Sequence, residues 1–519
     1  MEKTIEDFGL LIREGFGGSI GYGTNHAKSD VDLRGLFIPK RHFLLGINNV
    51  DQFNCKTVKD TKYGKSDDIE YFSLQKFINL ALEGNPNVVE QLFINREHVT
   101  FENEFGKELY ELRYEFLTKN AYGRFGGYAH AQMKRMDSKG NHNGHSSHRD
   151  IIEEFGYDTK HAMHLVRLYQ MGIQILRDGE LYTYRPNRQE LLDIRYGKYT
   201  LSQIKNYAEE LNKELEDAMM KSKIPDYPDF DKINRWVIDV TDRAHGLNTK
   251  KGVFKGVTFN VLPLEYEMVD KCSILTVANR LLRKKDKAQA VGVAVPYKDW
   301  FTGLRKFEEF KFEKTRIDNI HKVINKVRSC DPKLVDMLYA SEKHIIFEHP
   351  MAKEFKDKMK TMLSTKYAYN KAYSYVTGNL KAMQNWENLK DRWEKERATT
   401  NKKMTDYPPV PKKTLSENAA RMTKYGYDTL SAFDIVHVLK LFIELMNTGT
   451  IVDSRAYEPE LYAIKQGHYK TFEEFNDYVQ ELLAELEKAK DNSVLTNHNF
   501  NEIEDWLIDF IDRFHQQLD

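Results

Sequence analysis

A short acidic motif near the start of the chain has the residue types that metal-dependent phosphoryl transfer requires. Asp30 and Asp32 are two residues apart and alternate with the apolar residues Val31 and Leu33. Residues two apart on a β-strand point to the same face, so both carboxylates can bind the same pair of metal ions. Mg²⁺ prefers carboxylate oxygens, and two such ions can stabilise the attacking and the leaving oxygen of an in-line displacement. We therefore predict a site for two Mg²⁺ ions, with Mn²⁺ as the alternative metal.

A Gly-Ser pair and an arginine flank this motif. Gly18 and Ser19 are expected to form a turn at the start of a helix, where backbone N–H groups and a hydroxyl can hold the β- and γ-phosphates of a nucleoside triphosphate. Arg34 follows the acids and is expected to orient a phosphate group or to pair with the carboxylates. The glycines of this region do not match the spacing of a dinucleotide-binding loop.

A third carboxylate is expected from a later strand. Glu70 lies between Ile69 and Tyr71, an alternation that puts one acid on the functional face of a buried strand. We predict that Glu70 binds metal and acts as the general base towards the acceptor. Asp68 shares its face at two-residue spacing and is the second choice.

The positioning elements occur twice along the chain. Gly156-Tyr157-Asp158-Thr159 recurs as Gly426-Tyr427-Asp428-Thr429, and further blocks recur in the same order. We predict four parts: a catalytic core over 1–105, a helical domain over 106–248, a second core over 249–345 and a second helical domain over 346–519. The first core is expected to begin with a helix, followed by the Gly-rich turn and short strands.

The motifs together resemble the DNA polymerase β nucleotidyltransferase superfamily, and within it the bacterial and phage "predicted nucleotidyltransferase" family. The resemblance rests on Gly18-Ser19, Ser29–Gly35, Asn85-Pro86-Asn87 and the segment 156–168, and it covers residues 1–248. It implies an α+β fold, with a polymerase-β-like core of mixed sheet and helices plus a helical domain. We expect this pair to be repeated in a degenerate second half, in a chain that is rich in helix. The resemblance implies a reaction type but no substrate.

Comparison of the two copies separates candidate chemistry from architecture. When the strand register is carried from Pro39 to Pro296 and from Pro86 to Pro332, the metal-binding acids have no acidic counterpart. The expected counterparts of Asp30, Asp32, Glu70 and Ser19 are Lys287, Gln289, Arg316 and Thr276. We therefore expect the second copy to bind no Mg²⁺ in this way.

A basic helix face is expected opposite the acids. Lys160, His164 and Arg167 are spaced i, i+4 and i+7 and therefore share one face, with His161 beside them. In the second copy these positions are occupied by Leu430, Asp434, His437 and Ser431. The loss of basic residues where the acids are lost predicts that this face binds phosphate. Glu90 keeps an acidic counterpart, Asp336, which favours a structural role.

Composition narrows the class of protein. The 519 residues contain 78 basic and 78 acidic side chains, so the net charge is zero and gives no global argument for nucleic-acid binding. There is no apolar run long enough for a membrane span, and the first residues lack the basic and apolar pattern of a secretory signal, so we expect neither feature. The three cysteines are far apart, which is typical of reduced thiols in a cytoplasmic protein.

The interpretation that best unites these features is a Mg²⁺-dependent nucleotidyltransferase that moves a nucleoside monophosphate from a nucleoside triphosphate to an acceptor and releases pyrophosphate. RNA, a protein hydroxyl and a small molecule all remain as acceptors. The second copy is expected to enlarge the acceptor platform or to provide an assembly surface for an oligomer. The alternatives are a nucleotide sensor without catalysis and an assembly protein.

Overall fold

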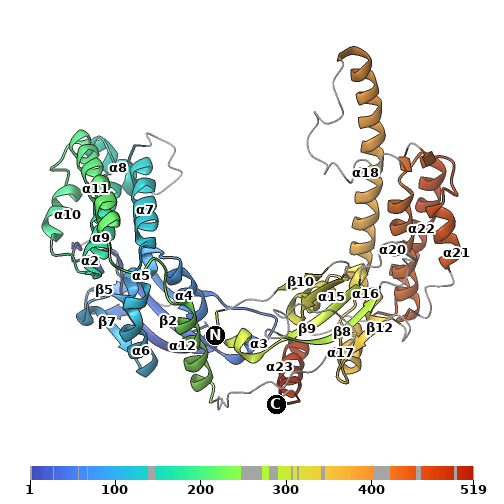
Figure 1. Cartoon of the computed structure of the whole chain (residues 1–519), viewed down its shortest axis with the longest axis horizontal. Helices are drawn as coiled ribbons and strands as arrows, with labels where there is room; N and C mark the ends of the chain where they lie inside the picture. Colours follow the sequence, from blue (N-terminus) through green and yellow to red (C-terminus); the bar gives the residue numbers. More distant parts are fainter. Residues whose placement is uncertain are drawn as a thin grey trace. The chain divides into compact units, whose positions relative to one another are not determined.

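The computed structural model divides the chain into two compact units (Figure 1). The first unit comprises Met1–Val253 and Lys298–Lys306, and the second comprises Phe254–Tyr297 and Phe307–Asp519. The structure describes residues 3–26, 29–55, 58–66, 68–137, 146–246, 272–279, 290–304, 308–312, 315–340, 345–400, 421–422, 424–451, 457–495 and 500–517. Among these residues, no helix combines the length and the apolar character needed to cross a membrane.

A five-stranded mixed sheet forms the centre of the first unit, in the order β3-β6-β2-β1-β7. Its strands are β1 (Gly9–Phe16), β2 (Asp32–Pro39), β3 (Gln52–Cys55), β6 (Asp68–Ser73) and β7 (Val99–Glu102), and β4 (Lys59–Thr61) and β5 (Gly64–Ser66) form a separate hairpin. The pair β2–β6 is parallel and the other neighbours are antiparallel. The first half of β2 alternates half-buried Asp32 and Arg34 with buried residues, whereas its second half is buried throughout. The start of β2 is therefore the part that can present polar groups.

Helices of the first unit build the second layer around one large apolar core (Figure 1). They are α1 (Ile5–Phe8), α2 (Gly18–Tyr22), α3 (Arg41–Leu45), α4 (Leu74–Leu82), α5 (Pro86–Leu92), α6 (Glu104–Leu112), α7 (Asn120–Asp137), α8 (Ser146–Phe155), α9 (Thr159–Asp178), α10 (Arg188–Arg195), α11 (Leu201–Lys221), α12 (Phe230–Ala244) and α14 (Lys298–Thr302). The central helix α9 packs against α7, α10 and α11. Its inward residues, such as Leu165, Val166 and Leu176, are fully buried in the core.

The second unit repeats the order of strands of the first. Its sheet has the order β10-β11-β9-β8-β12, with β9 and β11 parallel and the other neighbours antiparallel. The strands are β8 (Cys272–Asn279), β9 (Ala290–Pro296), β10 (Glu309–Phe312), β11 (Thr315–Asn319) and β12 (Ile345–Glu348). The helices are α15 (Ile320–Arg328), α16 (Pro332–Leu338), α17 (Ala352–Lys360), α18 (Thr365–Thr400), α20 (Thr429–Thr448), α21 (Glu458–Lys465), α22 (Phe472–Asp491) and α23 (Phe500–Gln516).

Side-chain supports also recur between the units. In the first unit, Trp236 and Arg243 of α12 both donate to Glu108 of α6. In the second, the corresponding residues of α23 and α17 make the same bonds, Trp506 and Arg513 to Glu354. α12 and α23 are therefore each attached to an earlier helix of their own unit in the same way.

Most of the expected elements are confirmed, and one is wrong. The passage from strand to helix over 69–82 is present as β6 and α4, and Ser73 caps α4 by accepting from the backbone N–H of Lys76 at 3.3 Å. The initial helix is the error, because α1 has only four residues and Gly9–Phe16 forms the strand β1. Its residues Ile12 and Phe16 belong to different apolar cores, so both sides of the segment are buried and no amphipathic period marks it as a strand.

The sheet registers also test the pairing of the two copies. In the first sheet, Arg34 pairs with Gly15 on one side and with Glu70 on the other. In the second sheet, Val291 pairs with Ala278 on one side and with Arg316 on the other. The expected match of Glu70 with Arg316 is thus confirmed. The match of Ser19 with Thr276 is wrong, because Thr276 occupies the place of Arg13 after the bulge in the first strand, whereas Ser19 lies in α2. Lys287 and Gln289 lie outside the described residues.

Candidate active site

Asp32 begins β2 and faces a carboxyl group on the neighbouring strand. Its Cα partner in the parallel pair is Asp68, the first residue of β6. Gly18, at the start of α2, has a φ of 56°, and a Cβ there would overlap Asp32 Oδ2. The backbone N–H of Gly17 donates to the carbonyl of Asp32 at 3.0 Å. Glycine is therefore required for the helix start to lie directly against the acid.

Proximity of these acids changes their pKa values. Burial and the hydrogen bond with Asp68 raise the pKa of Asp32 to about 6, although Arg34 opposes the rise. The hydrogen bond from Arg34 lowers the pKa of Asp68 below its usual value. Two carboxyl groups this close repel each other when both are ionised, so the pair favours a cation between or beside them.

Arg34 supplies such a cation from within the protein. Its Nη1 and Nη2 donate to the two carboxylate oxygens of Asp68 at 3.0 and 3.1 Å, and its Nε lies 3.4 Å from Glu70 Oε2. Asp32 Oδ1 is 3.8 Å from Nη2. Arg34 thus pairs with the acids, which is one of the two roles expected for it.

The structure separates the two candidates for the third carboxylate. Glu70 pairs in register with Arg34, two residues after the pair of Asp32 with Asp68. Its Oε1 accepts a hydrogen bond from Gln52. Asp68, the second choice, is the acid that meets Asp32. Asp68 and Glu70 are two apart on β6, as expected, whereas Asp30 lies before β2 and outside the sheet, contrary to the expectation that it shares a strand with Asp32. Only the register between strands shows which acids are adjacent.

Two adjoining cavities lie between the start of α2 and α9, and Asp32 lines the first of them. The acidic cavity, about 500 Å³, is lined by Gly18, Ser19, Tyr22, Thr24, His26, Ser29, Asp30, Asp32, Ile151, Lys160, Met163, His164 and Arg195. The basic cavity, about 860 Å³, is lined by Gly18, Tyr22, Asn87, Gly123, Arg124, Gly127, Tyr128, Ala131, Gln132, Arg135, Lys160, His161, His164, Arg167 and Leu168. Both volumes fall in the range of about 300–1,000 Å³ typical of ligand sites. The two cavities share Gly18, Tyr22, Lys160 and His164 and therefore adjoin each other.

The start of α9 places basic side chains opposite the acids. Asp158 caps the helix by accepting from the backbone N–H groups of Lys160 and His161 at 2.9 and 3.0 Å. The cap fixes the first turn, so that Lys160 and His164, one turn apart, line both cavities. Burial lowers the pKa of His164 well below its usual value, and the nearby cations Arg167 and Lys160 lower it further. At neutral pH, His164 is therefore an uncharged hydrogen-bonding group.

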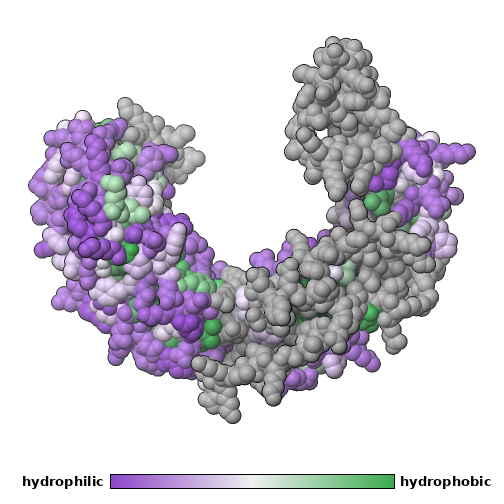
Figure 2. Space-filling model, viewed as in Figure 1, coloured by the Kyte–Doolittle hydropathy of each residue, from purple (hydrophilic) through white to green (hydrophobic). Residues whose placement is uncertain are grey.

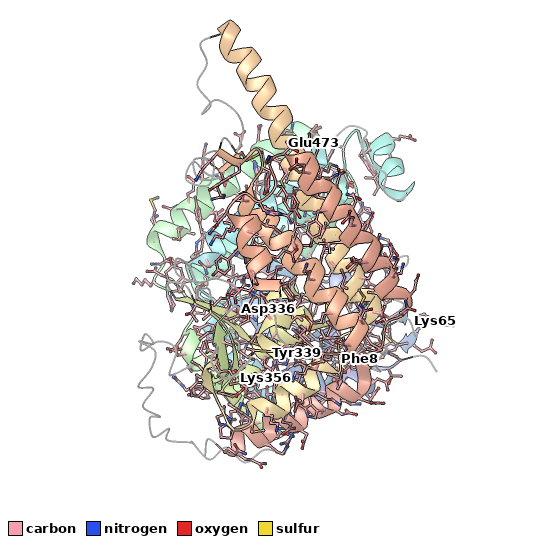
Figure 3. All side chains as sticks on the ribbon, turned by 90° about the vertical axis from the view of Figure 1, so that its right-hand side faces the viewer. Phe8, Lys65, Asp336, Tyr339, Lys356 and Glu473 are labelled. Atoms are coloured by element: carbon pink, nitrogen blue, oxygen red, sulfur yellow. The ribbon has the colours of Figure 1, made fainter. Side chains whose placement is uncertain are left out.

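Arg167 has a different environment from the other basic residues of α9. Its side chain is buried, its Nη1 donates to Glu90 Oε1 at 2.6 Å, and its guanidinium lies 3.7 Å from the centre of the Tyr22 ring. Tyr22 also donates its hydroxyl to Glu90. The charge of Arg167 is thus neutralised by Glu90, and this geometry gives no support to the prediction that Arg167 binds phosphate. The second unit has a matching buried pair, His437 with Asp336, at 3.2 Å. Asp336 is labelled in Figure 3.

Some residues of the cleft were not found from the sequence. Thr24, in the acidic cavity, is buried, and its Oγ1 has no hydrogen-bond partner within the described part of the chain. Arg124 and Arg135 of α7 line the basic cavity with Tyr128 and Ala131. Helix periodicity could have identified the residues of α7, because positions 124, 128, 131 and 135 share one helix face.

The donor groups fit a divalent cation. Among the described residues, no three His, Cys, Asp or Glu side chains are arranged to hold a metal ion. Mg²⁺, however, is commonly bound by one or two carboxylates together with phosphates of the substrate. Asp32 and Asp68 supply two carboxylates, and Asp30 lines the same cavity as Asp32. The cleft therefore has the ligands for a metal that arrives with a polyphosphate.

Comparison with known proteins identifies the class to which this site belongs. Residues 11–239 match the family model described as RlaP, "RNA repair pathway DNA polymerase beta family". This part of the chain, which includes both cavities, is therefore similar to the DNA polymerase β family. The family indicates nucleotidyltransferase-like activity, and enzymes of this type generally use divalent metals.

A phage protein is similar to a shorter part of the chain. It is the "Uncharacterized 38.9 kDa protein in nrdC-mobD intergenic region" of Enterobacteria phage T4, which is 29% identical over 135 residues. The aligned segment covers 25% of this chain and 39% of the phage protein. The name of that protein states no activity, so this similarity adds no substrate.

Proposed function

We propose that the first unit is a divalent-metal-dependent nucleotidyltransferase, which moves a nucleoside monophosphate from a nucleoside triphosphate to an acceptor and releases pyrophosphate. The observation that carries the proposal is the meeting of Asp32 and Asp68 against Gly18, in a cleft whose opposite wall presents Lys160 and His164. Acids and phosphate-binding groups thus face each other across a cavity large enough for a nucleotide.

Asp32 and Asp68 would hold the metal, together with Asp30 from the loop before β2. When bound, the metal, Mg²⁺ or Mn²⁺, would neutralise charge on the triphosphate and on the attacking and leaving oxygens. Arg34 holds Asp68 by a bidentate pair and contacts Glu70, so it fixes the orientation of the acids. We assign the third metal carboxylate to Asp68, and we give Glu70 a role in positioning Arg34.

The phosphates would lie between α2 and α9. Gly18 and Ser19 line the acidic cavity at the start of α2, where backbone N–H groups are not yet used by the helix. Lys160 offers a charge from the other wall, and neutral His164 offers a hydrogen bond. The buried hydroxyl of Thr24 is a further donor in this cavity.

RNA is the acceptor that we favour over a protein hydroxyl or a small molecule. The matching family is described as part of an RNA repair pathway.

The second unit supports a single active site per chain, because the register position of Glu70 is occupied by Arg316, whose guanidinium pairs with Glu309 and Asp318. We infer that this unit is a duplicated copy that has exchanged a catalytic site for internal ion pairs.

The proposal is tested by incubating the full chain with each α-³²P-labelled nucleoside triphosphate, Mg²⁺ or Mn²⁺, and separate RNA, protein and metabolite fractions. We expect label to move to RNA, only with metal present, and not with Asp32→Asn. Transfer to another fraction would retain the enzyme but replace the acceptor. Binding of triphosphate without transfer to any fraction would favour a nucleotide sensor.

A further inference from the structure

The basic cavity is larger than the acidic one and contains two arginines, Arg124 and Arg135, that the proposed reaction at the acids does not use. Among the described residues, its lining has no Asp or Glu side chain, whereas Arg124, Arg135 and Lys160 all contribute to it. Arg167 also lines it, but its charge is neutralised by Glu90. A wall of one charge attracts an anionic ligand. Because the basic cavity adjoins the acidic one, such a ligand would reach the reacting groups.

The arrangement along α7 fits a strand better than a single nucleotide. Arg124 and Arg135 lie on one face of the helix and are eleven residues apart, which corresponds to about 16 Å at 1.5 Å per residue. That span is several times the distance of about 3.4 Å between neighbouring phosphates along a stacked strand. Arg124 also pairs with Glu83 at 3.5 Å, but both side chains are about half exposed, so the pair costs little to exchange.

Two glycines of α7 supply an independent observation. Gly123 and Gly127 line the basic cavity, one helical turn apart, and a Cβ at either would meet no atom of the described residues within 4 Å. Packing therefore does not require glycine at these positions, although glycine weakens a helix interior. Gly126 differs, because a Cβ there would lie 3.1 Å from Leu215. Packing does not explain these two glycines, and the space beside them is open. A ligand can therefore approach the helix backbone closely at these positions.

We propose that the basic cavity binds the acceptor as a single-stranded nucleic acid, with its phosphodiester groups on Arg124 and Arg135 and its backbone passing close to Gly123 and Gly127. This inference rests on the proposed nucleotidyl transfer for its orientation, since the strand end then enters the acidic cavity. The binding itself does not depend on catalysis and is measured separately.

The test is fluorescence anisotropy of a labelled 20-nucleotide single-stranded RNA, and of DNA of the same sequence, on the full chain at several salt concentrations. Arg124→Gln/Arg135→Gln should weaken RNA binding at least about 10-fold. The slope of log affinity against log salt should fall by about 1.4, because each phosphate that the protein neutralises on a single strand contributes about 0.7 to it. Lys134→Gln is the matched control, because Lys134 is the exposed neighbour of Arg135 on α7 and does not line the cavity. Gly127→Gln should also weaken binding by filling the path of the strand.

Unchanged binding in the double variant, or an equal loss with Lys134→Gln, would overturn the proposal. So would a wild type that binds neither oligonucleotide yet transfers label to a protein or a metabolite, and in that case the proposed transferase would stand. Binding of the nucleoside triphosphate, followed with a fluorescent analogue, should be the same in wild type and double variant. Strand binding that is lost in the double variant, in a chain that transfers no label, would support this site while the proposed transferase failed.

Discussion

The two units have the same order of strands and the same supporting contacts, but they differ where the first unit has its cleft. At one register position in the sheet the first unit has Glu70 and the second has Arg316. On the matching helices, Lys160 and His164 of α9 stand where α20 has Leu430 and Asp434. The strand order and the bonds from Trp236 and Trp506 to the supporting glutamates, by contrast, are the same in both units. A shared fold therefore does not carry the activity, which depends on a few polar side chains placed on it.

The buried pair beneath the cleft is an example of what is kept. Glu90 with Arg167, and Asp336 with His437, join the helix after each sheet to the central helix of each unit. All four side chains are buried. Such a pair is also present in the second unit, where Arg316 occupies the register position of Glu70, which indicates that the pair serves the fold. The first unit otherwise presents mainly hydrophilic residues on the face seen in Figure 2, so its large apolar side chains are mostly used for packing.

The largest difference is expected between two acids of the same strand. Asp68→Asn should reduce nucleotidyl transfer about 100-fold or more, the cost of losing one preorganised electrostatic group. Glu70→Gln should reduce it about 10-fold or less, since Arg34 keeps its bidentate pair with Asp68. Steady-state rates of label transfer measure both. A larger loss with Glu70→Gln would return the third metal ligand to Glu70.

Breaking the buried pair should affect the first unit more than the second. Glu90→Gln leaves the Arg167 charge buried and unpaired, which typically costs about 3–5 kcal/mol. Asp336→Asn retains an oxygen that can accept from His437, so we expect about 1–2 kcal/mol. Denaturant unfolding of the full chain, with a separate probe for each unit, measures these changes. Equal losses would mean that the two pairs are equivalent in charge.

Ionisation of Asp32 should lower the stability of the metal-free first unit as the pH rises. Its pKa is raised from 3.8 to about 6 in the folded chain, so the folded state binds the extra proton and stability falls as pH rises between these values. Asp32→Asn should therefore stabilise the metal-free first unit at pH 7, by on the order of 1 kcal/mol, with little effect near pH 4. Thermal unfolding in a chelator at several pH values checks this. A destabilised variant at pH 7 would show that ionised Asp32 is already well compensated without metal.

The smallest effect is expected from a glycine. Gly127→Ala should stabilise α7 by roughly 0.5–1 kcal/mol, because no atom of the described residues lies within 4 Å of the added Cβ. Gly126→Ala, where Leu215 Cδ2 would lie 3.1 Å away, is the matched control and should gain less or lose stability. Thermal unfolding compares the two. A destabilised Gly127→Ala would mean that the helix itself needs glycine there.

Local sequence was sufficient for some parts of the site. The Gly-Ser turn and the passage from β6 to α4 each depend on neighbours within a few residues, and the structure contains both. The strand that was expected to carry both Asp30 and Asp32 begins only at Asp32, so that Asp30 lies before β2. The repeated blocks also led to the correct match of Glu70 with Arg316. The choice between Asp68 and Glu70 needed the register between strands, which alternation within one strand cannot supply.

Other parts depended on contacts that sequence patterns do not contain. Helix periodicity put Arg167 on the face of Lys160 and His164, but it could not show that Arg167 lies deep enough to meet Glu90. Thr276 was paired with Ser19 because the register was carried through a turn whose length differs between the units. Phe16 pairs with Leu33 in the first, whereas Asn279 pairs with Ala290 in the second.

The central claim is that one unit of the two holds a nucleotide and a metal at its acids. Isothermal titration of the full chain with a non-hydrolysable nucleoside triphosphate analogue and Mg²⁺ tests it most directly. The account predicts one nucleotide per chain, lost in Asp32→Asn/Asp68→Asn and retained in Arg316→Gln of the second unit. Two equivalent sites per chain, or binding that survives the loss of both aspartates, would contradict it.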